Sequence, residues 1–248
     1  LFESRSKNRM GLLMWMSHPC WPSMVWQTYD YYLEPTAAYF AIKKASEPLH
    51  IQWNPATDEV EVVNYSAGTH SHLTARVQIL NMDASVAWEK ETTVDSREDT
   101  TEKCIKLEFP ETLSEVYFIK LWLLEDGKIL SDNFYHASRK GINYQALKQL
   151  PEVTLDCQAK MAQDKEGNWT ATVTLTNPTS TPALMTRINV VGDKDGDQFL
   201  PILYEDNYFA LLPGEQKEVS VRWKDVDTRG NSPVIRITGY NVKELSRQ

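Results

Sequence analysis

Short segments in which apolar and polar residues alternate fill the chain from residue 49 onward. The stretch "HLTARVQIL" places Leu73, Ala75, Val77 and Ile79 on one face and polar side chains on the other. A period of two is typical of a strand with one buried face. About seven such segments occur in each of the ranges 49–150 and 151–248, separated by turn signals. This spacing predicts a mainly β chain with two tandem immunoglobulin-like β-sandwiches.

The expected strands of the first sandwich can be placed closely. Besides "HLTARVQIL" they are 49–53, 60–65, 86–94, 104–109, 116–124 and 129–136. Asp126-Gly127 lies between the last two and is a strong hairpin signal. In the second sandwich "VTLDCQAKM", "WTATVTLTN", "EVSVRW" and "VIRITGY" alternate in the same way, and Trp169 and Trp223 fall in phase with core residues.

Residues 1–48 follow a different pattern and hold 9 of the 26 aromatic residues. The run "MGLLMWM" (10–16) is continuously apolar, which predicts a strand buried on both faces, as in a parallel sheet. "PTAAYFAIKKA" (35–45) predicts a helix with Pro in the first turn and two Lys at the end. One strand and one helix cannot form a sheet. We therefore expect a fragment of a larger α/β fold, with the helix docked on residues 49–150.

The aromatic segment and a later stretch carry a resemblance to a known family. Both "WMSHPCWPSMVWQTYDYYLEPTAAYFAIKKASEP" and "LYEDNYFALLPGE" resemble glycoside hydrolase family 2, in the exo-β-glucosaminidase and β-mannosidase branch. The matching positions in the first stretch are Trp15, Trp21, Pro22, Ser23, Trp26, Asp30, Tyr31, Tyr32, Leu33, Pro35, Tyr39, Phe40, Lys43, Lys44, Ala45 and Pro48. His18-Pro19 departs from the polar Asn-Asp or Asn-Asn pair of many relatives, which leaves the sugar open.

The resemblance implies that residues 1–48 are the C-terminal remnant of a (β/α)8 catalytic barrel, with two accessory sandwiches after it. Family members use two Glu about 5 Å apart in a retaining mechanism. Both are expected to precede Leu1, so we assign no catalytic residue here and expect the chain alone to be inactive. Trp15 would lie at the end of the last barrel strand, where such barrels bind substrate. It is therefore the one candidate substrate-binding residue, through its flat ring under a sugar.

Charge and composition narrow the classes of partner. The net charge is −8 and no Lys/Arg-rich run occurs, so we expect no nucleic-acid partner. No apolar stretch approaches the ~20 residues of a membrane span, and no secretory leader is visible. The implied partners are the rest of the barrel and, through it, a glycan. We expect an exported parent protein, no metal and no cofactor, and the oligomeric state stays open.

Several other motifs have a structural and a chemical interpretation. His70 and His72, and the "DKDGD" run at 193–197, are compatible with metal binding, but we expect a loop and a hairpin turn. Glu34 is expected beside the helix N-terminus, where negative charge is favourable. Asp206 and Asn207 are expected to satisfy backbone groups. Asn64 and Asn168 begin glycosylation triplets. The three Cys are expected to be free and mostly buried.

Two other functions remain open from the sequence. The sandwiches could form a non-catalytic module that binds carbohydrate or protein through exposed aromatic side chains. A secreted adhesion or structural protein is a third hypothesis, although the strand–helix segment at the start has no place in it. Loss of glycan binding on Trp→Ala substitution would favour the binding module. Hydrolysis of aryl β-glycosides by the chain alone would contradict the accessory role.

Overall fold

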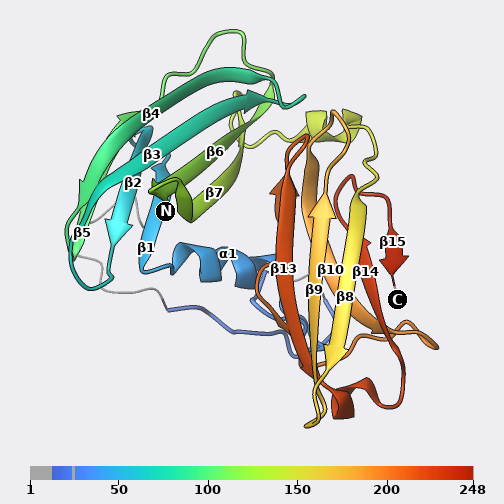
Figure 1. Cartoon of the computed structure of the whole chain (residues 1–248). Helices are drawn as coiled ribbons and strands as arrows, with labels where there is room; N and C mark the ends of the chain where they lie inside the picture. Colours follow the sequence, from blue (N-terminus) through green and yellow to red (C-terminus); the bar gives the residue numbers. More distant parts are fainter. Residues whose placement is uncertain (1–12, 24–25, 248) are drawn as a thin grey trace. The chain divides into compact units, whose positions relative to one another are not determined.

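The computed structural model describes residues 13–23 and 26–247, and these form two compact units. The first unit contains residues 13–15 and Ile42–Lys148. The second contains Met16–Ala41 together with residues 149–247. Each unit is built on antiparallel sheets, so the chain is mainly β as its alternating pattern predicts (Figure 1).

The first unit is a sandwich of a three-stranded and a four-stranded sheet. The smaller sheet has the order β1-β2-β5, with bounds Leu49–Asn54, Glu59–Asn64 and Thr100–Lys106. The larger has the order β4-β3-β6-β7, with bounds Val86–Ser96, His70–Asn81, Val116–Glu125 and Lys128–Ser138. All seven strands expected from the sequence are present. The 3-10 helix η1 (Gln145–Gln149) follows β7.

Alternation decides which side chains of β3 form the core. Leu73, Ala75, Val77 and Ile79 are all 0% exposed. They face residues of β2 and β5 across the sandwich and pack in one hydrophobic cluster. Burying such side chains contributes about 1.5–3 kcal/mol each relative to exposure, which makes this face the main source of stability.

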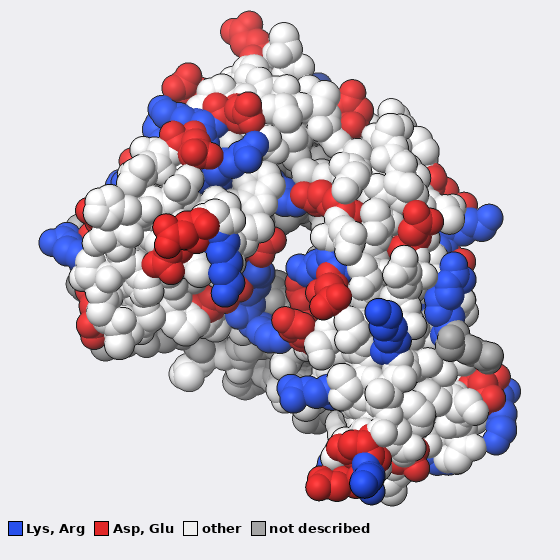
Figure 2. Space-filling view, viewed as in Figure 1, with Lys and Arg blue, Asp and Glu red and all other residues white. Residues whose placement is uncertain are grey.

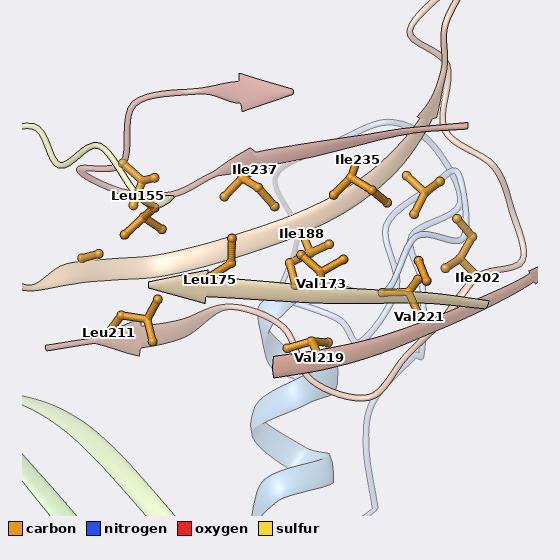
Figure 3. Packing of buried hydrophobic residues seen from close by; sticks show 14 of the residues in the cluster. Leu155, Val173, Leu175, Ile188, Ile202, Leu211, Val219, Val221, Ile235 and Ile237 are labelled. Atoms are coloured by element: carbon orange, nitrogen blue, oxygen red, sulfur yellow. The ribbon is translucent and has the colours of Figure 1, made fainter. Parts of the chain in front are cut away.

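The second unit repeats the architecture. One sheet has the order β11-β13-β9-β8, with bounds Leu203–Tyr204, Gln216–Lys224, Asn168–Thr176 and Asp156–Gln163. The other has the order β12-β10-β14-β15, with bounds Phe209–Leu211, Ala183–Gly192, Pro233–Thr238 and Leu245–Arg247. A short 3-10 helix, η2 (Asp225–Thr228), follows β13. Side chains from the two sheets face one another in the core, among them Val173, Ile188, Val219 and Ile235 (Figure 3).

An asparagine holds the chain after the second strand of each sandwich. Asn64 Nδ2 donates to the carbonyls of Gly68 and Ser96, and its Oδ1 accepts from Ser66. Asn177 repeats this arrangement: its Nδ2 donates to the carbonyls of Thr181 and Leu211, and its Oδ1 accepts from Thr179. Both asparagines are 0% exposed. We call these two residues the asparagine clamps.

The segment before the sandwiches differs from its prediction in two places. Helix α1 (Ala37–Ala45) forms where "PTAAYFAIKKA" predicts it, and its first turn bonds to the carbonyl of Thr36. Residues 13–16 are exposed and form no strand, so the strand expected over 10–16 is wrong for these four residues. A strand needs a hydrogen-bonded neighbour, and no described strand pairs with them. Residues 10–12 lie outside the described residues.

Helix α1 is also attached differently from the expectation. Its residues up to Ala41 belong to the second unit, where Phe40 packs against Tyr208 at 5.9 Å between ring centroids. Only its last turn belongs to the first unit. The prediction that the whole helix docks on residues 49–150 is therefore wrong for its first half. Among the described residues, no helix is both long and apolar enough to cross a bilayer.

Candidate functional site

The aromatic segment of residues 13–36 exposes most of its large apolar side chains. Trp15, Trp21 and Trp26 are 82%, 68% and 70% exposed, and Tyr32 is 66% exposed. So many exposed large apolar side chains within one short segment make it a candidate interaction site. The candidate substrate residue Trp15 is thus accessible, as are Trp21 and Trp26.

Backbone hydrogen bonds give this exposed segment a defined shape. The carbonyl of Ser17 accepts from the Tyr29 backbone N–H at 2.9 Å and from Thr28 Oγ1 at 3.1 Å. The carbonyl of Thr28 in turn accepts from the Thr36 backbone N–H at 2.9 Å. Thr36 Oγ1 also donates to the carbonyl of Gln27 at 2.7 Å. Gln27 and Thr28 are buried whereas Ser17 is exposed, so these bonds are partly shielded from water.

A turn built on Asp30 closes the segment before the helix. Asp30 Oδ1 accepts from the backbone N–H groups of Tyr32 and Glu34, each at 2.9 Å. The Asp30 N–H donates to the carbonyl of Glu34 at 3.0 Å. Leu33 takes a left-handed φ of 66°, which turns the chain between these contacts. Asp30 is therefore a structural residue in this loop.

Glu34 forms an ion pair with Arg187 of β10. The Arg187 guanidinium also lies over the Tyr208 ring, 5.9 Å from its centroid. Burial alone would lower the pKa of Arg187, but the nearby Glu34 carboxylate outweighs it and raises that pKa above its ordinary value. Glu34 precedes α1, as expected, but its carboxylate pairs with Arg187 of the second sandwich.

The "LYEDNYF" stretch (203–209) bonds to β10, the strand that carries Arg187. Asn207 Oδ1 accepts from the Ile188 N–H at 2.7 Å, and its Nδ2 donates to the Ile188 carbonyl at 2.8 Å. The Asn207 side chain thus pairs with β10 as a strand would. Tyr204 Oη accepts from the Val190 N–H at 3.1 Å. The predicted structural role of Asn207 is confirmed, and the motif holds the strand that carries Arg187.

A second polar cluster holds the end of α1 in the first unit. Lys44 Nζ bonds to Glu47 at 2.9 Å and to Asp132 at 2.8 Å, and Ser131 Oγ donates to Glu47 at 2.6 Å. Burial alone would raise the pKa of Glu47, but hydrogen bonds from His50, Ser131 and Lys44 hold it below its ordinary value. Burial likewise opposes the charge of Lys44, but Asp132 and Glu47 raise its pKa.

Most other candidates have structural roles. His70 accepts or donates a bond with Ser66, and His72 is exposed. The "DKDGD" run forms a tight turn in which the Gly192 N–H donates to the Asp197 carbonyl. No group of His, Cys, Asp or Glu suited to hold a metal occurs in the part of the chain that the structure describes. Cys20 is exposed, contrary to expectation, while Cys104 and Cys157 are half-buried.

The tryptophans of the second sandwich do not present a flat sugar-binding face. Trp169 and Trp223 stack at 5.8 Å with an interplanar angle of 3°. Trp223 is 4% exposed and belongs to the core, and Trp169 packs against that core and donates Nε1–H to Asp225. Figure 2 shows basic residues interspersed with acidic ones on the drawn face, with no continuous basic patch.

Sequence reasoning missed Arg187, the partner of Glu34, and Asp132, the partner of Lys44. Arg187 lies 153 residues from Glu34, and Asp132 lies 88 residues from Lys44. Neither pairing has a local spacing pattern. The sequence signal for Arg187 was a single basic residue in the strand "MTRINVVG", which also holds Thr186 and Asn189, and a basic residue at such a position is common on a solvated face.

The fold defines a class: two tandem immunoglobulin-like β-sandwiches, preceded by a segment with exposed aromatic side chains. Residues 133–242 match the family described as the exo-β-D-glucosaminidase Ig-fold domain. The exo-β-D-glucosaminidase of Streptomyces avermitilis is 33% identical over 96% of this chain and 29% of its own length. The mannosylglycoprotein endo-β-mannosidase of Lilium longiflorum is 23% identical over 94% of this chain and 31% of its own length.

Solved structures agree with these relatives. The Amycolatopsis orientalis exo-chitosanase CsxA, in a complex with PNP-β-D-glucosamine, superposes with a TM-score of 0.89 and 27% identity. The match covers 99% of this chain and 32% of that chain. The chain is similar to exo-β-glucosaminidases and β-mannosidases of glycoside hydrolase family 2, and its residues 133–242 match the immunoglobulin-like domain of the former. It corresponds to a C-terminal portion spanning less than a third of the length of these relatives.

Proposed function

We propose that residues 1–48 complete one wall of a (β/α)8 catalytic barrel and that the two sandwiches hold this wall in place. The exposed aromatic segment carries the proposal. Its backbone is held by internal hydrogen bonds and by the ion pair with Arg187, yet the side chains of Trp15, Trp21 and Trp26 are exposed. A preformed shape with an open apolar surface is what a segment of a larger core would show.

The parent enzyme would cleave a terminal β-linked glucosaminide or mannoside with retention, using a carboxylate pair supplied by the rest of the barrel. The relatives support a β-glycosidase: they include an exo-β-D-glucosaminidase and an endo-β-mannosidase, and this chain spans less than a third of the length of each. Trp15 would offer its ring to the apolar face of the sugar. The parent would be exported, and its substrate would be a glycan outside the cell.

Aryl glycosides test this proposal directly. The chain alone and the longest polypeptide that contains it are incubated with p-nitrophenyl β-D-glucosaminide and with p-nitrophenyl β-D-mannoside. We expect p-nitrophenol from one of the two sugars with the longer polypeptide and none with the chain alone. Turnover by the purified chain alone, or no turnover of either sugar by the longer polypeptide, contradicts the proposal.

A further inference from the structure

We infer that Arg187 is a positioning residue: it fixes the loop that follows Trp15 by gripping Glu34, and so sets where the Trp15 ring is presented to a sugar. This inference rests on the proposed role of Trp15. Arg187 lies on β10 of the second sandwich and forms its ion pair with Glu34 of this loop. Its effect on the sugar site is therefore transmitted through the loop.

The transmission follows two sets of hydrogen bonds within the second unit, joined by the peptide bond between Tyr29 and Asp30. Arg187 holds the Glu34 side chain, and the Glu34 backbone is tied to Asp30 in both directions. The neighbouring Tyr29 N–H donates to the carbonyl of Ser17. Ser17 is two residues after Trp15 in the sequence. Loss of the ion pair should therefore loosen the loop first near Glu34, at the end that is farther in sequence from Trp15.

The backbone beside Trp15 also depends on this restraint. Met16 stands at a left-handed φ of 64°. A residue with a Cβ disfavours this conformation and keeps it only where its surroundings hold the chain on either side. The bonds to the Ser17 carbonyl supply that hold on the C-terminal side. A loosened loop would let Met16 return to an ordinary conformation and turn the Trp15 ring away.

The ion pair is partly buried and difficult to replace. The side chains of Arg187 and Glu34 are 26% and 13% exposed. Arg187 Nε is buried and has no hydrogen-bond partner among the described residues, and the guanidinium is compensated by Glu34 and the Tyr208 ring. Removing one partner of such a pair leaves a buried charge without its counterion, which costs more than the pair itself contributes.

Amide hydrogen exchange on this chain tests the restraint. We expect Arg187→Ala and Glu34→Ala each to speed exchange in peptides covering 26–36 by about tenfold, the size expected for a charge-assisted bond with partial screening. The charge swap Glu34→Arg with Arg187→Glu should restore much of the protection, and Arg187→Lys should restore part of it. Arg222→Ala removes an exposed Arg from β13, in the other sheet, and should change nothing in this loop.

Unchanged exchange in Arg187→Ala, or a charge swap no better protected than the single variants, overturns the inference. A second readout uses the longer polypeptide and its better aryl glycoside. Arg187→Ala should raise KM and lower kcat, Arg187→Lys should recover part of the loss, and Arg222→Ala should match the unaltered protein. Equal kinetics in all three also overturns it. An unaltered longer polypeptide without hydrolysis defeats the proposed function instead, and the exchange result still decides whether Arg187 fixes the loop.

Discussion

The two sandwiches share a two-sheet architecture and an asparagine clamp but hold the preceding segment with different side chains. The first unit grips the last turn of α1 with a cluster of four polar side chains, Lys44, Glu47, Ser131 and Asp132. In the second unit, the Arg187 guanidinium forms an ion pair with Glu34 in the loop before the helix and lies over the Tyr208 ring. The two units therefore share an apolar core and an asparagine clamp. They differ in the surface side chains that bind the preceding segment.

The largest expected effect tests whether the two cores are independent. Leu121 and Leu175 are both 0% exposed, one in each core. Truncation of either to Ala should destabilise its own unit by about 2–5 kcal/mol through lost burial and a cavity. Hydrogen exchange should report the loss in that unit only. Leu203→Ala, at a residue that is 62% exposed, is the control. Equal loss of protection in both units would show that they unfold together.

The asparagine clamps come next in size. Asn64→Ala and Asn177→Ala each leave two carbonyls without their side-chain donor. We expect each variant to lose about 2 kcal/mol of unfolding free energy, because unsatisfied buried groups are costly. Urea unfolding followed by hydrogen exchange measures the unfolding free energy of each variant. If only one of the two loses stability, the clamps are equivalent in geometry but unequal in energy.

Acid should weaken the grip of the first unit. The pKa of Glu47 is held below its ordinary value of 4.5, so its contribution is complete above that value and disappears as the pH falls through the folded value. Its side chain is 28% exposed, so Glu47→Gln should cost only about 1 kcal/mol at neutral pH. The difference from the unaltered chain should vanish in acid. Glu108→Gln, on the surface of the same unit, should show no such pH dependence.

The smallest effect on stability is expected in the aromatic segment. Trp26 is 70% exposed, so Trp26→Ala should change the unfolding free energy of this chain by less than about 0.5 kcal/mol. Trp223→Ala, at a residue that is 4% exposed, should cost about 3–5 kcal/mol. Thermal unfolding of the two variants compares them. A large loss for Trp26→Ala would mean that the segment belongs to the core of this chain already.

The regularity of the sheets explains why their strands could be predicted. Alternation in "HLTARVQIL" assigns four core residues correctly because burial on one face imposes a period of two. Asn207 could be assigned a structural role because a short amide readily satisfies nearby backbone. Helix α1 could be placed from its Ala residues and its terminal Lys residues, but it begins at Ala37, so Pro35 lies before the helix and not in its first turn as predicted.

The attachments could not be predicted, for a physical reason. Glu34 and Arg187 meet only because the fold brings β10 beneath the loop, and no periodic signal joins residues 153 positions apart. The strand expected at residues 10–16 fails at 13–16 because a buried strand depends on neighbours as much as on its own sequence. Local patterns therefore predicted the sandwiches, whereas the candidate site depends on contacts between distant residues.

Covalent footprinting of tryptophan tests the central claim, that the aromatic segment is a wall of a larger core. Trp15, Trp21 and Trp26 are oxidised in the chain alone and in the longest polypeptide that contains it, with buried Trp223 as the internal reference. We predict rapid modification of all three in the chain alone, with strong protection of Trp21 and Trp26 in the longer polypeptide. Equal modification of Trp21 and Trp26 in both would contradict the account.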